Sequence, residues 1–143
     1  MIMNKLSEYL QGISHIENKC LVDKMNFRLK CFEDGTISTL DKDGYPTNHF
    51  LIFVKEFPLY DLENAKSTPL KLLFSMIEDI WHHRYHGWSK GESKLYISTC
   101  GWSGNEAIID ALKMNQLIWH HIFVSEHRGG HYEFDMNRIS DVD

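Results

Sequence analysis

The sequence predicts a single α+β domain, in which a mixed, mostly antiparallel sheet of about five to six strands packs against two main helices and a short N-terminal helix. The chain has 143 residues, of which 43% are hydrophobic and 13% aromatic, and this suits one domain with a substantial core. Segments with strand periodicity and segments with helix periodicity are partly segregated along the chain, which is typical of α+β proteins. We expect one domain over residues 1–143, with a frayed acidic tail at 136–143.

The N-terminal third predicts a short helix followed by three strands. Residues 4–11 have helical spacing of their apolar side chains. Apolar and polar residues alternate in "MNFRLKCFEDGTISTL" (25–40), on either side of an Asp-Gly pair that is typical of a β-hairpin turn. A second turn, "DKDGYP" (41–46), leads to the continuous apolar run "HFLIFVKEF" (49–57), which predicts a buried strand. The three strands are expected to form an antiparallel meander.

The main packing helix is predicted to begin at Pro69 and to end near His86. Pro69 suits the first helical position, and Ser67 or Thr68 can cap the helix. Gly87 is expected to end it in the left-handed conformation. The apolar residues at helical spacing are Leu70, Leu73, Phe74, Ile77, Ile80 and Trp81.

The C-terminal half predicts a strand at "KLYIST" (94–99), a helix over 105–115 and a strand at "LIWHHIFVS" (117–125). The two strands flank one helix, so we expect one parallel crossover in an otherwise antiparallel sheet. A last strand, "HYEFDM" (131–136), follows a tight Arg-Gly-Gly turn. Ser103 and Glu106 have the Ser-x-x-Glu spacing of a capping box at the helix start.

Charge and cysteine content exclude several classes of protein. The net charge of -5 and the pI of about 6.0 argue against a nucleic-acid binder with a broad basic face. The three cysteines, Cys20, Cys31 and Cys100, are odd in number and widely spaced, which argues against a disulfide framework or a zinc ribbon and favours a reducing compartment. The N-terminal residues contain no apolar run long enough for a signal peptide or a membrane span. We therefore expect a cytoplasmic protein without membrane contact, as a monomer or a homo-oligomer.

The first candidate site is the glycine-flanked loop "CGWSGNE" (100–106) between the strand and the helix. A hydrolase elbow needs Gly-x-Ser-x-Gly, but Asn105 stands at the second glycine position; a phosphate loop needs Gly-Lys-Ser/Thr, which is missing. Two interpretations remain. Either Ser103 and the glycines build a helix start on which Trp102 packs, or the backbone amides bind an anion while Trp102 stacks on a ligand ring.

The second candidate site is the turn "HRGGH" (127–131). Two glycines beside a guanidinium can form an anion nest, although an ordinary polar turn also explains them. Trp88 and Trp102 lie in loop contexts, and exposed Trp with Arg is typical of binding hot spots. The predicted ligand- or partner-binding residues are Trp88, Gly101, Trp102, Ser103, Gly104, Asn105, Arg128 and His131.

The histidines suggest a third possibility. His82 and His86 have the spacing of metal ligands on a helix, and His120 or His121 is a candidate third ligand. No glutamate lies between the pair as in the His-Glu-x-x-His proteases, and histidines near a helix end often have a structural use. We therefore predict no metal and no cofactor.

The segment "YISTCGWSGNEAIIDAL" (96–112), followed by "RGGHYEF" (128–134), resembles a group of small phage- and prophage-encoded proteins. In that pattern a Gly-Trp-Ser-Gly-Asn-Glu loop opens a helix and an Arg-Gly-Gly-His-Tyr hairpin closes the domain. Cys100 stands where the pattern has another glycine. The resemblance covers residues 94–134. It implies a phage or prophage origin, and accessory phage proteins of this size often act on host defences.

These observations favour binding over catalysis, through the 101–105 loop and the 128–131 turn. The expected partner is a host protein, such as a component of an antiviral defence, or a small anionic, nucleotide-like ligand. One alternative is a histidine-based or metal-dependent hydrolase or nuclease. Another is an immunity protein that neutralises a basic toxin through its acidic surface.

Overall fold

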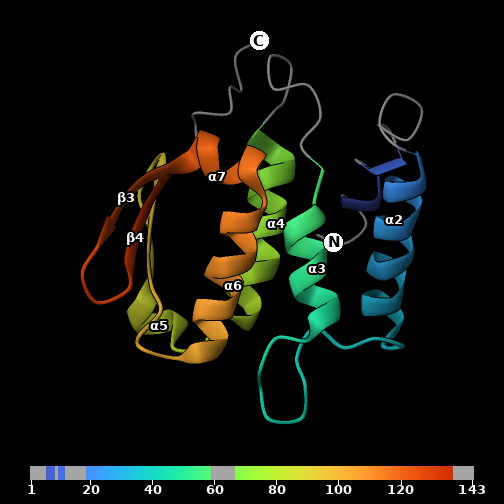
Figure 1. Ribbon diagram of the computed structural model, residues 1–143, viewed down its shortest axis with the longest axis horizontal. Helices are drawn as coiled ribbons and strands as arrows, with labels where there is room; N and C mark the ends of the chain where they lie inside the picture. The colour runs from blue at the N-terminus through green and yellow to red at the C-terminus, as the bar shows by residue number, and fades with distance from the viewer. Residues whose placement is uncertain (1–5, 9, 12–18, 59–66, 137–143) are drawn as a thin grey trace.

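The α+β class is confirmed by the computed structural model, which describes residues 6–8, 10–11, 19–58 and 67–136. Figure 1 shows the sheet at one end of the molecule, with α4, α6 and α7 packed against it and α3 and then α2 beyond them. The elements, in chain order, are α2 (Lys19–Asp34), α3 (Asn48–Glu56), α4 (Ser67–Ile80), α5 (Arg84–Gly87), β1 (Trp88–Lys90), β2 (Lys94–Ser98), α6 (Ser103–Met114), α7 (Gln116–Ile122), β3 (Phe123–His127) and β4 (His131–Asp135).

The sheet of the described residues has four strands in the order β1-β2-β4-β3, and every neighbouring pair is antiparallel. The predicted count of five to six strands is therefore wrong. The predicted parallel crossover is present: β2 and β3 are both antiparallel to β4, so they run parallel to each other and are connected through α6 and α7, with β4 between them. Leu95 pairs with Phe134, and both side chains are buried against the helices. Tyr96 pairs with Glu133, and both point to the opposite face, where Tyr96 is 47% exposed. This alternation leaves one face of the sheet open.

The predicted hairpin over 25–40 is wrong, because α2 runs through most of it. Val22, Met25 and Leu29 recur at helical spacing and are buried on one side, whereas Phe27 is 65% exposed. Phe27, one of the apolar residues whose alternation suggested a strand, therefore faces solvent. Gly35, with φ of 81°, does form a positive-φ turn, but it follows the end of a helix.

The predicted strand over 49–57 is also a helix, α3. Thr47 is its N-cap, and the Thr47 hydroxyl oxygen accepts a hydrogen bond from the Phe50 amide at 3.2 Å. Phe50, Phe53 and Phe57 are buried at spacings of a helical face. A nine-residue apolar run suits a buried strand and a buried helix equally, so periodicity alone did not distinguish them.

The predicted strand over 117–125 is helical as far as Ile122, and β3 begins only at Phe123. Asn115, which is buried, explains the extra helix. Its side-chain oxygen accepts from the Ile118 amide at 3.3 Å, and its side-chain nitrogen donates to the carbonyl oxygens of Val54 (3.1 Å) and Phe57 (2.9 Å). Asn115 therefore caps α7 and ties it to the end of α3.

Helix α4 ends at Ile80, earlier than predicted. The left-handed residue after it is His83, with φ of 61°, and Gly87 has no positive φ, so the predicted role of Gly87 as a left-handed stop is wrong. Gly87 is instead required by a close approach, because a Cβ there would lie 2.7 Å from the Ser98 carbonyl oxygen. The predicted cap at Ser67 or Thr68 falls outside the described side chains.

One continuous core joins the helices to the sheet, and it includes Leu6 and Leu10 from the helical residues near the N-terminus, where a helix was predicted. Met136 is buried, and its amide donates to the Ser93 carbonyl oxygen at 2.8 Å; the rest of the predicted tail, 137–143, lies outside the described residues. In the part of the chain that is described, no helix combines the length and the apolar character needed to cross a membrane.

Candidate functional site

The two loops predicted from the sequence meet in space. The β2–β4 pairing ends at Ser98 and His131, and just beyond it the Thr99 amide donates a hydrogen bond to the Gly130 carbonyl oxygen at 3.0 Å. Gly130 has φ of 78°, and a Cβ at this position would overlap the hydroxyl oxygen of Thr99. The loop after β2 and the turn before β4 are therefore held against each other.

The loop after β2 uses its own amides. Cys100 N–H donates to the Ser98 hydroxyl at 3.2 Å, Gly101 N–H to the Thr99 hydroxyl at 3.4 Å, and Trp102 N–H to the Thr99 carbonyl at 3.0 Å. The left-handed conformations of Cys100 and Gly101, with φ of 53° and 72°, make this tight loop possible. In this arrangement the three amides are not available to bind an anion.

The Trp102 ring is held between two other rings. It stacks on Tyr45, with centroids 4.9 Å apart, and on His82, with centroids 4.4 Å apart. Gly104 lies so close to the Trp102 ring that a Cβ there would overlap it. Both faces of Trp102 are thus covered by its own chain, so it does not have a free face on which a ligand ring can stack.

Asn105 and Gly104 are buried and serve the fold. The Asn105 side-chain oxygen accepts from the His82 amide at 3.1 Å, and the side-chain nitrogen donates to the carbonyls of His82 (2.8 Å) and Thr99 (3.3 Å). Asn105 is 0% exposed and therefore offers no atom to a partner. The predicted Ser103–Glu106 capping box is also wrong, because α6 begins at Ser103 and its N-cap is Trp102, which makes no side-chain cap bond.

A groove on the open face of the sheet lies beside the joined loops and has a volume of about 530 Å³. Predicted residues Trp88 and His131 line it, although Trp88 also packs on the core residues Phe74 and Trp81. Sequence reasoning did not single out its other members as one surface, since they come from separate elements. We call it the histidine groove and define it by His86, Tyr96, Cys100, His127, His131 and Glu133.

Several groups at the groove already have partners. His127 Nε2 lies 3.0 Å from the Ser125 hydroxyl, and the Glu133 carboxylate lies 3.2 Å from Lys94 Nζ. Arg128, in the turn between β3 and β4, is exposed and forms no ion pair with any carboxylate of the described residues. The Arg128 charge is therefore available to a partner.

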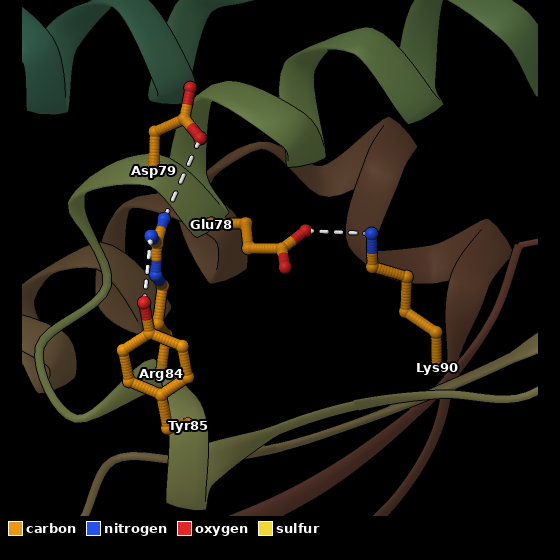
Figure 2. Close-up of polar contacts among 5 residues, drawn as sticks. All are labelled: Glu78, Asp79, Arg84, Tyr85 and Lys90. Atoms are coloured by element: carbon orange, nitrogen blue, oxygen red, sulfur yellow. Dashed lines mark hydrogen bonds and ion pairs between the residues drawn. The ribbon is translucent and has the colours of Figure 1, made fainter.

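Arg84 and Tyr85, which precede His86 in α5, belong to a polar network with Glu78, Asp79 and Lys90 (Figure 2). Arg84 is drawn between Asp79, 3.8 Å away, and the Tyr85 phenol oxygen, to which it donates at 3.4 Å. Glu78 and Lys90 form a second pair at 2.8 Å. The hydrogen bond from Arg84 lowers the pKa of Tyr85, and the same bond raises the pKa of Arg84. The Arg84 charge is thus paired with the Asp79 carboxylate, while Tyr85 is 86% exposed.

The candidate metal ligands do not come together. His82 stacks on Trp102, His86 lines the histidine groove, and His120 lies at a separate depression on α7. Because α4 ends at Ile80, the four-residue spacing of His82 and His86 does not place them on one helix face. In the described ranges no group of three or more His, Cys, Asp or Glu side chains is arranged to hold a metal ion.

Of the eight predicted binding residues, six thus keep some exposed surface: Trp88, Gly101, Trp102, Ser103, Arg128 and His131. Tyr96, Cys100 and His127 join Trp88 and His131 at the groove only through the tertiary structure. No protein-family model, no curated protein and no solved structure matches this chain. The site therefore rests on its geometry.

Proposed function

We propose that this protein is a phage or prophage accessory protein that binds a protein of the bacterial host, such as a defence component, and does so without catalysis. The proposed contact surface comprises the histidine groove, Arg128, and the exposed residues Gly101 and Ser103. The single observation that supports it most is the Thr99–Gly130 hydrogen bond, because it joins the two loops into one surface.

The phage origin rests on the resemblance of residues 94–134. One conformational detail supports it: Cys100 has φ of 53°, a left-handed conformation in which glycine has the lowest energy. Glycine is the residue that the resembled pattern has at this position. A glycine at this position of the pattern would suit the observed backbone, and this supports the proposed resemblance.

The geometry favours a protein partner over a small anionic ligand. The amides of residues 100–102 donate within the loop, and both faces of Trp102 are covered, so these three amides and this ring are not free to hold a nucleotide. The exposed groups of the proposed surface include Tyr96 and Arg128, residue types that are enriched in protein–protein hot spots.

Co-purification from lysate of a bacterial host tests this proposal. We expect the wild-type protein to retain a host protein that Arg128→Glu no longer retains, and the purified pair to form a complex again when mixed. The double variant His120→Gln/His121→Gln, on α7 outside the groove, serves as the matched control and is expected to retain the partner.

Native mass spectrometry of the untagged protein addresses the alternatives. A bound metal ion, together with an activity that a chelator removes, would support the hydrolase or nuclease instead. A bound mass of a few hundred daltons, lost in Arg128→Glu, would support sequestration of a small ligand. Either result, or equal retention of the host protein by wild type and Arg128→Glu, would contradict the proposal.

A further inference from the structure

The charge at the histidine groove differs from that of the protein as a whole. The chain has 20 acidic and 15 basic residues. Among the described residues that line the groove, Glu133 is the one with a carboxylate, and it is paired at 3.2 Å with Lys94, which also lies 3.9 Å from Asp135. Three histidines line the groove, and Arg128, which forms no ion pair with the described residues, lies in the adjoining turn between His127 and His131, so imidazole groups and one unpaired cation are found here.

Deepening the proposed function, on which this step rests, we infer that the histidine groove receives an acidic segment of the partner protein. Aspartate or glutamate side chains of that segment would lie among His86, His127 and His131, with Arg128 at the rim. Opposite charges on the two surfaces steer such partners together and select against basic ones.

The groups that line the groove are compatible with an anionic partner, and β1 adds Trp88 and Ser89, which carry no charge. From α5 comes His86, while Arg84 is turned to Asp79. The loop after β2 contributes the Cys100 thiol, and β2 contributes the Tyr96 phenol. From β3 comes His127, which is hydrogen-bonded to Ser125. From β4 come His131 and Glu133, and the Glu133 carboxylate is paired with Lys94.

The groove suits acidic side chains better than nucleic acid or phosphate. Phosphate sites commonly use clustered backbone amides, but the amides of residues 100–102 are occupied. Nucleic acid requires several Lys or Arg side chains along its backbone. Among the described residues at the groove, Lys94 is already paired with Glu133 and Asp135, which leaves Arg128 as the cation without an ion pair. Carboxylates, in contrast, can accept hydrogen bonds from imidazoles and from the Tyr96 hydroxyl.

A synthetic oligoglutamate peptide is the probe that tests this inference. We expect oligoglutamate to bind, and we expect the dissociation constant, measured by calorimetry, to increase about tenfold when the salt concentration is raised from about 0.05 to about 0.5 M. Amide chemical shifts in NMR spectra should change around His86, His127 and His131, and an oligoglutamine of equal length should cause none of these changes.

The triple variant His86→Gln/His127→Gln/His131→Gln is expected to bind oligoglutamate at least about tenfold more weakly and to keep a folded NMR spectrum, since all three side chains are exposed. The matched control His120→Gln/His121→Gln is expected to behave as wild type. Absence of peptide binding, binding elsewhere, or unchanged binding by the triple variant would overturn the inference.

Inorganic phosphate and oligothymidylate are the competing probes. If either binds the groove more tightly than oligoglutamate, the partner class is wrong. The outcome also separates the two proposals. A host protein still retained by wild type and lost from Arg128→Glu would leave the proposed function standing while the acidic class fails.

Discussion

The Thr99 amide and the Gly130 carbonyl are 3.0 Å apart, and this hydrogen bond connects a loop that precedes α6 with a turn that precedes β4. It continues the β2–β4 ladder by one residue beyond Ser98 and His131. The candidate surface is thus built on the end of a sheet, where the backbone positions of both loops are set by strand pairing.

Gly130→Ala should separate the contribution of this contact from ordinary backbone strain. Gly130 and Gly35 both have positive φ, 78° and 81°, so alanine costs about 1–2 kcal/mol of strain at either position. Only at Gly130 does the added Cβ overlap the Thr99 hydroxyl. We expect a larger loss of unfolding free energy for Gly130→Ala than for Gly35→Ala in urea titrations. Equal losses would mean that Thr99 moves away at no cost.

Asn105→Ala should destabilise the protein by about 1–3 kcal/mol, because it leaves the His82 amide and the Thr99 carbonyl without this partner in a buried place. The His82–Trp102 stack should loosen, which tryptophan fluorescence would report. Asn48→Ala, at an exposed position at the start of α3, is the control and should change stability little. A similar loss of stability in both variants would contradict the role of the Asn105 hydrogen bonds in holding His82 and Thr99 together.

Cys100→Gly should stabilise the protein by about 1 kcal/mol, since glycine adopts the observed φ of 53° without the Cβ penalty. The same substitution at Cys20, which lies within α2, should destabilise, because glycine is a poor helix former. Thermal or urea unfolding measures both. A destabilised Cys100→Gly would show that the thiol makes a contact worth more than the strain.

Arg84→Gln should raise the pKa of Tyr85 towards its ordinary value of 10.0, because the hydrogen bond and the charge of Arg84 lower it. Phenolate formation, followed by ultraviolet absorbance and compared with a Tyr85→Phe background, measures the change. Lys90→Gln is the matched control, since Lys90 pairs with Glu78 in the same network and not with Tyr85 (Figure 2). An unchanged Tyr85 titration in Arg84→Gln would exclude the bond in solution.

Local signals predicted much of the C-terminal half. The alternation of residues 131–136 gave β4, the glycines at 129 and 130 gave its turn, and the strand-to-helix junction near Gly101 was placed correctly. The two helices α4 and α6 were predicted from their apolar spacing. These elements are decided by turn chemistry and by periodicity, both of which lie within a few residues of the chain.

Sequence reasoning failed where a distant contact chose between two local solutions. Asn115, bonded to Val54 and Phe57, begins α7 in a segment that was predicted to be a strand. Asn105 lies 23 residues after His82 in the chain, and its side chain holds the His82 backbone in the bend that follows α4.

From the sequence alone, the α+β class and the two candidate loops could be predicted. The contact between these loops, the stacking of Trp102, and the groove shared by His86, His127 and His131 follow from the three-dimensional arrangement. Periodicity reports which side of an element is apolar, whereas adjacency depends on strand register and on hydrogen bonds between residues far apart in the chain.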